Sequence, residues 1–374
     1  MPNETHLTIA SLTNQHMSDF QSDSFKVEEN AIEKLPATLT DDPSPIAQIG
    51  IKQLAARARG YITAANSANT RRAYTSDWTH FSDWCKSQGL EAVPPDTKTV
   101  GLYITALASG CDDQQKSSVA TIERRLSALS WSYRQRGMAL DRKDRHISTV
   151  LAGIRNTHGT PPLQKEAILG SDIIRMLKTL DAQTLRGKRD RAMLLVGFTG
   201  GLRRSEIAGL DCGRNQTDDG RGWIEIHNEG MLVIIRGKTG WREVEISKGS
   251  SKDTCPIFAV EEWLQSSSIA HGPLFRRVKG QGKAVGPDRL NDKEIARLVK
   301  RTALAAGIRS DLQDDERRML MFSGHSLRAG LATSAEVDER FVQKQLGHAT
   351  SEMTRRYQRN RQRFRVNLTK ASGL

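Results

Sequence analysis

The stretch at residues 157–165 constrains the fold of this chain more than any other feature of its sequence. It reads Thr157-His-Gly-Thr-Pro-Pro-Leu-Gln-Lys165 and has no hydrophobic period. Gly159 and the pair Pro161-Pro162 disfavour both helix and strand, and a proline holds the residue before it in an extended conformation. The chain has 374 residues, enough for two hydrophobic cores. The sequence therefore predicts two domains, with residues 157–165 as an extended linker between them.

The region before this linker, residues 46–156, has the apolar spacing of helices. A first short amphipathic segment spans Ile46 to Leu54, and four longer stripes follow. These stripes are Tyr74, Trp78, Phe81 and Trp84; Val100, Tyr103, Ile104 and Leu107; Val119, Ile122, Leu126, Leu129 and Tyr133; and Ile147, Val150, Leu151 and Ile154. Spacings of three and four residues are typical of helices that bury one face, so an all-helical domain is predicted.

Four arginines lie off the cleanest of these stripes, at Arg124, Arg125, Arg134 and Arg136. Side chains on the solvent side of a helix can contact DNA phosphates or enter a major groove. We therefore predict that these arginines form a DNA-binding surface.

The second domain, predicted at residues 166–374, changes its hydrophobic period partway. Helical spacing holds from Ser171 to Phe198, and a period of two begins at Gly222. Strands are predicted at 223–227, 231–236 and 242–246, with Gly237-Lys-Thr-Gly240 as the turn between the last two. Helical spacing resumes at Asn291. The predicted fold class is mostly α: an all-helical first domain, then a mixed α+β domain with one small antiparallel sheet.

Charge is distributed unevenly along the chain. Residues 1–49 carry eight acidic side chains and two lysines, a net charge of −6, whereas the whole chain carries +13. Residues 50–374 therefore carry +19, and a basic body of this size favours a polyanionic partner, above all nucleic acid. Residues 1–45 are polar and acidic with too few apolar side chains for a core, so a disordered acidic tail is predicted there.

The sequence also predicts where the protein resides. It has no apolar run of 18 residues and no signal-like N-terminus, which favours a soluble, cytoplasmic protein without a membrane partner. The four cysteines lack the spacing of metal ligands and are interpreted as reduced thiols: Cys85, Cys111, Cys212 and Cys255. No metal and no cofactor are predicted.

Side chains suited to phosphate chemistry recur in short motifs of the second domain. They are Arg203 and Glu206 after Thr199-Gly-Gly-Leu, Lys238 in the predicted turn, His325-Ser-Leu-Arg328, Leu346-Gly-His348 and Tyr357. A single tyrosine among so many basic side chains suggests a phenol oxygen that contacts a phosphate. Two guanidiniums could neutralise that phosphate as it gains charge, because each offers a planar fork to two oxygens.

In these motifs, taken in order over residues 165–374, the chain resembles the tyrosine recombinase (phage-integrase-like) family. The resemblance implies a helical, SAM-like core-binding domain at residues 46–156 that binds DNA and a catalytic domain at 166–374. The acidic first segment favours the Cre-like or Xer-like two-domain arrangement.

The resemblance also implies a role for each motif residue. Tyr357 would be the nucleophile, and Arg203 and Arg328 would bind the scissile phosphate. Arg204 is the alternative to Arg203, which we prefer because it lies three residues before Glu206 and so shares a helical face with it. Lys238 would protonate the leaving 5′-oxygen, with Lys248 as an alternative. His325 and His348 would orient phosphate oxygens and help to move the phenol proton. The family can hold a tryptophan at the position of His348, so the resemblance implies hydrogen bonding there and not obligatory proton transfer. Glu206 would support its neighbours.

The predicted function is a DNA-associated, site-specific recombinase that cleaves and rejoins duplex DNA through a 3′-phosphotyrosyl intermediate. The resemblance implies inverted-repeat half-sites, a homo-tetramer on two DNA sites and a Holliday junction. Two alternatives remain: a type IB topoisomerase with similar chemistry, and a DNA-binding regulator without activity. The short stretch after Tyr357 and the complete motif set favour the recombinase.

Overall fold

The computed structural model describes residues 45–110, 115–161, 164–237 and 240–355, together with residues 369 and 372. Residues 1–44 of the predicted acidic tail, Lys238 and Tyr357 lie outside these ranges. The chain divides into two compact units, one ending at Pro162 and the other beginning at Leu163. The roles predicted for the two units remain predictions.

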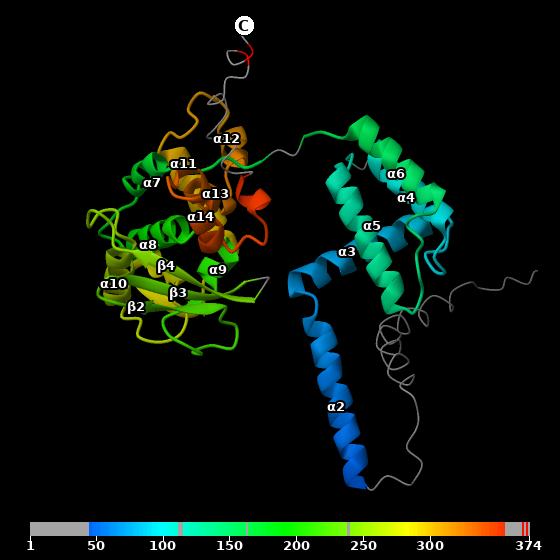
Figure 1. Ribbon diagram of the computed structural model, residues 1–374, viewed down its shortest axis with the longest axis horizontal. Helices are drawn as coiled ribbons and strands as arrows, with labels where there is room; N and C mark the ends of the chain where they lie inside the picture. Colours follow the sequence, from blue (N-terminus) through cyan, green and yellow to red (C-terminus); the bar gives the residue numbers. More distant parts are fainter. Residues whose placement is uncertain are drawn as a thin grey trace, which may run out of the picture. The chain divides into compact units, whose positions relative to one another are not determined.

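The first unit is helical throughout its described residues, as the apolar spacing predicts (Figure 1). Its helices are α2 (Pro45–Ala64), α3 (Ala68–Ser87), α4 (Thr97–Ser109), α5 (Val119–Gln135) and α6 (Arg145–His158). In four of these helices the side chain of the N-cap residue accepts a hydrogen bond from a backbone N–H of the first turn, and these caps are Ser67, Asp96, Ser118 and Asp144. Helix α2 is longer than the short segment predicted at residues 46–54 and continues to Ala64.

The core of the first unit consists of the predicted stripes. Helix α3 packs on α5, and α4 packs on α6. The buried side chains come from all four helices: Phe81, Cys85, Val100, Tyr103, Ile104, Leu107, Ala108, Ile122, Leu126, Leu129, Tyr133, Ile147, Leu151 and Ile154. Most aromatic side chains of the predicted stripes thus lie in this core or pack against it.

The second unit combines helices with two small sheets. Its helices are α7 (Gly170–Leu177), α8 (Leu185–Thr199), α9 (Arg204–Ala208), α10 (Pro256–Ser267), α11 (Asp292–Ala305), α12 (Asp315–Met321), α13 (His325–Ser334) and α14 (Glu339–Leu346). Its strands are β1 (Leu210–Asp211), β2 (Gly222–Ile226), β3 (Gly230–Gly237), β4 (Gly240–Ser247), β5 (Arg276–Lys279) and β6 (Ala284–Arg289), with a 3₁₀ turn at Gly280–Gly282.

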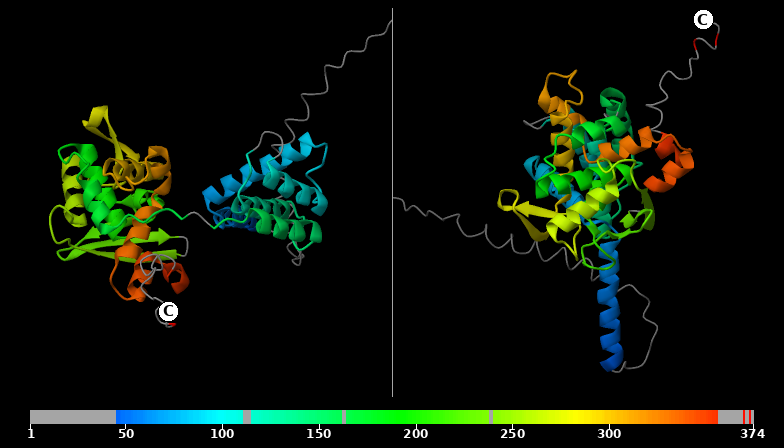
Figure 2. Two further views of the ribbon diagram at one scale, coloured as in Figure 1. Left: turned by 90° about the horizontal axis from the view of Figure 1, so that it is seen from above. Right: turned by 90° about the vertical axis from the view of Figure 1, so that its left-hand side faces the viewer.

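The three predicted strands are present as β2, β3 and β4, paired antiparallel with Val233 opposite Val244. Two features differ from the prediction of one antiparallel sheet. The short strand β1 joins the sheet in parallel to β2, which makes the sheet mixed, and β5 and β6 form a second, two-stranded sheet. Figure 2 shows this second hairpin, in yellow, at the edge of the unit. Strand β1 is too short for a pattern, and charged, Gly and Pro residues in β5 and β6 obscure their alternation.

Alternation along β3 and β4 gives the main sheet one buried face. Met231, Val233 and Ile235 of β3 point into the core with Val244 and Ile246 of β4. Helices α8 and α10 pack against each other over this face (Figure 1). Arg242 lies on the same face of β4, two residues before Val244. It is charged and half-buried.

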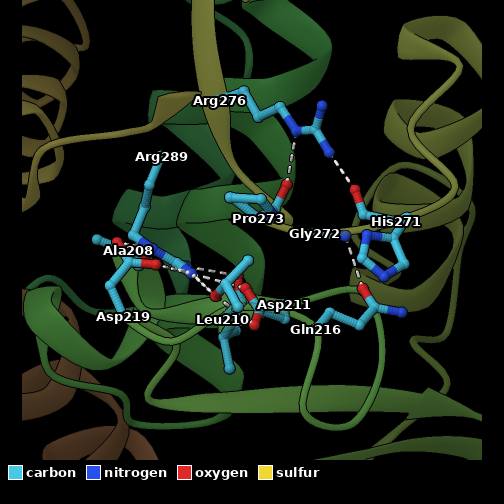
Figure 3. A network of polar contacts seen from close by, with 11 residues as sticks. Ala208, Leu210, Asp211, Gln216, Asp219, His271, Gly272, Pro273, Arg276 and Arg289 are labelled. Carbon is cyan, nitrogen blue, oxygen red and sulfur yellow. Dashed lines mark hydrogen bonds and ion pairs between the residues drawn. The ribbon is translucent and has the colours of Figure 1, made fainter. Parts of the chain in front are cut away.

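A polar network fixes the loop between β1 and β2 (Figure 3). Arg289 of β6 donates to the carbonyl oxygens of Ala208 and Leu210, 3.1 Å away in each case, and to Asp211 Oδ1 at 2.7 Å. It also donates to Asp219 Oδ1 at 3.0 Å. Because Ala208 is the last residue of α9, this arginine anchors the end of the helix that carries Glu206.

None of the helices in the described ranges is long and apolar enough to cross a membrane.

Candidate active site

Arg203 lies at the tight turn from α8 into α9. Gly201 in this turn has a φ of +58°, and a Cβ added to it would collide with Leu346 of α14, so glycine allows the turn to pack closely. Arg203 is extended, at the N-cap of α9, and its side chain keeps 32% of its surface exposed. Its Nη1 donates to Glu206 Oε1 at 2.6 Å, while its backbone N–H donates to Glu206 Oε2 at 2.8 Å. Glu206 thus holds both ends of Arg203.

Glu206 is buried but remains charged. Burial alone would raise the pKa of its carboxyl, but the Arg242 guanidinium, the Arg203 backbone N–H and the Arg203 guanidinium together hold this pKa below its usual value. A buried carboxylate between two arginines is stabilised by both and restricts both. Glu206 therefore contacts both arginines, and its supporting role in catalysis stays a prediction.

Arg328 connects three segments of the site from within the core. It lies on α13 and is 1% exposed. Its Nη1 donates to the carbonyl oxygen of Gly201 at 2.7 Å, and its Nη2 donates to that of Leu346 at the end of α14. These contacts fix the guanidinium plane between the turn after α8 and the end of α14.

Two histidines complete the cluster. His325 is the first residue of α13 and keeps an exposed face, whereas His348 follows α14 and is buried. His348 Nδ1 shares a hydrogen bond with Thr354 Oγ1 at 2.9 Å. Desolvation, Arg328 and Arg203 lower the pKa of His325, and the same three causes lower the pKa of His348 to about 4. Both rings are therefore neutral at neutral pH, and a pKa of about 4 makes His348 a weak proton acceptor.

The structure brings together five of the residues predicted for the site. Arg203 and His325 are its accessible members, and Glu206, Arg328 and His348 lie beneath them. The alternative arginine, Arg204, points elsewhere: its Nε is 3.1 Å from Asp292 Oδ2 of α11. Lys238 and Tyr357, the predicted general acid and nucleophile, lie outside the described residues.

Lys248, the alternative general acid, is not near this cluster along β4. It follows the last residue of β4, while Arg242, which touches Glu206, lies near the first. Six residues of extended strand separate them by about 20 Å. Lys248 is therefore a poor candidate for this site.

Arg242 is a residue of the site that sequence reasoning missed. Its Nη2 donates to Glu206 Oε2 at 2.9 Å, and its side chain is 13% exposed. The signal was present in the sequence: in the predicted strand 242–246, Arg242 shares a face with Val244 and Ile246, so an arginine occupies an inward position.

The arginines predicted to bind DNA from the first unit differ in their surroundings. Arg125 Nη1 donates to Tyr103 Oη at 3.3 Å, and the Arg136 guanidinium lies 4.2 Å from the centre of the Trp78 ring. These two stabilise contacts between helices. Arg124 forms an ion pair with the buried Asp77 but is half-exposed, and Arg134 is exposed. Arg124 and Arg134 are thus the more exposed of the four, and DNA binding by these arginines stays a prediction.

The lowered pKa of His348 makes a prediction about pH. Because the pKa is about 4 when folded and about 6.5 when unfolded, the unfolded chain binds a proton first as pH falls. The contribution to stability is complete above pH 6.5 and falls by about 3 kcal/mol toward pH 4. An NMR titration should show a histidine resonance with a midpoint near 4 that is absent from His348→Asn. The variant should lose less unfolding free energy than the wild type on acidification, and equal losses would contradict the prediction.

Comparisons with known proteins agree on one family. Residues 167–363 match the model of the phage integrase family. An integrase/recombinase XerD homologue of Selenomonas ruminantium is 29% identical over 317 residues, which cover 82% of this chain and 86% of that protein. The recombinase Cre of Escherichia phage P1 is 27% identical over 281 residues, covering 72% and 76%. A solved structure of the XerH recombinase bound to its difH substrate, in a pre-cleavage complex, shares the fold with a TM-score of 0.50 at 16% identity, over 89% of this chain and 91% of that one.

Proposed function

The chain belongs to the phage integrase family of tyrosine recombinases, and we propose that it cleaves and rejoins duplex DNA at specific sites through a 3′-phosphotyrosyl intermediate. One observation carries the proposal. Arg203, His325, Arg328 and His348 come from three separate segments, and the two arginines lie close enough to both rings to lower their pKa values. Such a cluster of fixed positive charge and neutral imidazole suits a phosphate that gains charge during reaction.

The proposed chemistry has one bond formed and one broken in each step. The Tyr357 phenol oxygen attacks the scissile phosphorus, and the bond from phosphorus to the 5′-oxygen breaks. The single phenol proton passes to one of the neutral imidazoles, and Lys238 gives a proton to the leaving 5′-oxygen. The phosphotyrosyl bond keeps the phosphoester, so a 5′-hydroxyl can reverse the reaction without a nucleotide.

The arginines would have different parts in binding the phosphate. Arg203 is partly exposed and can meet a phosphate oxygen directly. Arg328 is buried, so we propose that small side-chain shifts in the DNA complex bring its guanidinium into contact. Before that contact forms, the positive charge of Arg328 would act on the phosphate through space, from beneath Arg203.

The proposed assembly follows the family. We propose that each protomer binds one half-site of an inverted repeat, that four protomers join two sites, and that strands exchange through a Holliday junction. The positive charge of residues 50–374 supports binding to duplex DNA.

The function is tested by capturing covalent complexes. Fragments of the source replicon are incubated with the protein in EDTA without nucleotide, denatured, and the DNA bound to protein is sequenced. We expect covalent complexes to form in EDTA, since guanidiniums and not a metal supply the positive charge. We also expect one recurrent junction, since the proposed cleavage is site-specific. Two copies of that site on one plasmid should recombine. Scattered junctions, or relaxation of supercoils without exchange of partners, would contradict a site-specific recombinase.

The general acid makes a further prediction. Lys238→Ala should slow cleavage of normal DNA by about 10²- to 10⁴-fold, because an unprotonated 5′-oxygen is a poor leaving group. A substrate with sulfur at that position needs no proton and should be cleaved at nearly the wild-type rate. Lys248→Ala serves as the matched control. If both substrates slow equally in Lys238→Ala, the lysine is not the acid.

A further inference from the structure

Arg242 is an arginine on the core-facing side of the main sheet. It precedes Val244 and Ile246 on the inward face of β4, and its side chain is 13% exposed. Burying a guanidinium is costly unless its charge is paired and its N–H groups are bonded. Among the described residues, Arg242 bonds to Glu206 of the site and to the Gln345 carbonyl at the end of α14, while its buried Nε has no hydrogen-bond partner there.

The first partner is Glu206. Its two oxygens are divided between two arginines: Oε1 accepts from Arg203 Nη1 at 2.6 Å, and Oε2 accepts from Arg242 Nη2 at 2.9 Å. Glu206 Oε2 also accepts the backbone N–H of Arg203. Removing Arg242 would leave this buried carboxylate with Arg203 as its only arginine partner. Arg203 would then be held more tightly against Glu206 and would be less available to bind a phosphate.

The second partner is the end of α14. Arg242 Nη1 donates to the carbonyl oxygen of Gln345 at 2.5 Å, and Arg328 donates to the next carbonyl, that of Leu346. Carbonyls at a helix C-terminus have no partner within the helix and carry partial negative charge, so two cations there are favourable. The two arginines together fix the position of the last carbonyls of α14. They therefore also fix the position of His348, which lies two residues after the helix ends.

The third contact is with Gly347, directly before His348. Gly347 has a φ of +59°, and a Cβ added there would lie 2.7 Å from Arg242 Cδ. The arginine side chain thus packs against the left-handed residue that turns the chain from α14 to His348. This contact joins β4 to the backbone of the histidine motif.

We infer that Arg242 is a positioning residue for DNA cleavage, which holds Glu206, and through it Arg203, at a fixed place relative to the end of α14 and His348. It acts through these neighbours and not on the phosphate. The inference rests on the proposed function. It assigns to β4 the task of joining the two halves of the site, the α8–α9 turn and the segment after α14.

A double-mutant cycle tests the inference. The full-length protein is compared with Arg242→Met, Glu206→Gln and the double variant, with a nicked duplex that carries the captured junction and traps the covalent complex. Half-site affinity should stay within about threefold, while the cleavage rate of Arg242→Met falls about 30- to 100-fold, as small misplacements of reacting groups can cost this much. In the Glu206→Gln background, the same substitution should cost at most about fivefold, because the carboxylate through which it acts is gone.

Controls separate the possible failures. Arg297→Met makes the same chemical change at an exposed position of α11 and should leave the cleavage rate unchanged. If Arg242→Met does not fold, Arg242→Gln is used in the same cycle, since it keeps a polar side chain but removes the charge that pairs with Glu206. An equal loss in both Glu206 backgrounds, or no loss at all, would overturn the positioning role. Absence of adduct in the wild type would instead refute the proposed function.

Discussion

Tyr357→Phe is expected to abolish the covalent protein–DNA complex while leaving DNA affinity unchanged. The substitution removes one oxygen atom, and the ring that remains has no nucleophile to attack phosphorus. The signal should fall below detection, a loss of at least about 10⁴-fold, on a denaturing gel with an end-labelled nicked duplex. Affinity for a half-site, measured by mobility shift, should stay within about twofold, because phosphate and base contacts are made by other residues.

Tyr61→Phe is the matched control for this experiment. Tyr61 lies on α2 and is 76% exposed, so it offers an accessible phenol that belongs to none of the site motifs. Its replacement should leave adduct formation unchanged. An adduct that persists in Tyr357→Phe and disappears in any other tyrosine variant would reassign the nucleophile.

Arg203→Ala is expected to produce the second large effect, a loss of about 10³-fold in cleavage rate. A preorganised donor aimed at developing charge contributes about 10²- to 10³-fold, and a permanent charge more. Arg203 is partly exposed, so the fold should tolerate its loss. Arg203→Lys should recover only part of the rate, because an ammonium lacks the planar fork of a guanidinium. Single-turnover cleavage of the nicked duplex measures both variants.

The neighbouring arginine provides the sharpest control for this prediction. Arg204 has the same chemistry one residue later, but it pairs with Asp292 of α11. Arg204→Ala should slow cleavage by no more than about threefold. A larger loss from Arg204→Ala than from Arg203→Ala would mean that the first arginine of the site has been misidentified.

Much of the fold could be predicted because its signal is periodic. The stripe of α5 became core: Ile122, Leu126 and Leu129 are fully buried. The strands β2 to β4 were visible because buried and exposed side chains alternate in them. Strand β1 was not visible, since two residues cannot show a period, and its pairing depends on β2, which lies beyond the intervening loop.

The site divides in the same way. Its arginines and histidines could be identified because they lie in short motifs whose order carries information. The contacts of Arg242 could not, because one partner is a backbone carbonyl, at Gln345, and a carbonyl has no signature in a sequence. Arg125 was placed on the solvent side of α5 by periodicity, but its long side chain reaches the Tyr103 hydroxyl of α4.

The most direct test of the central claim is to identify the residue that carries the DNA. The wild-type protein is trapped on the nicked duplex, the DNA is digested to a short remnant, and the modified peptide is sequenced by mass spectrometry. We predict that the remnant is attached through its 3′-phosphate to Tyr357. Attachment to any other residue, or through a 5′-phosphate, would contradict the mechanism.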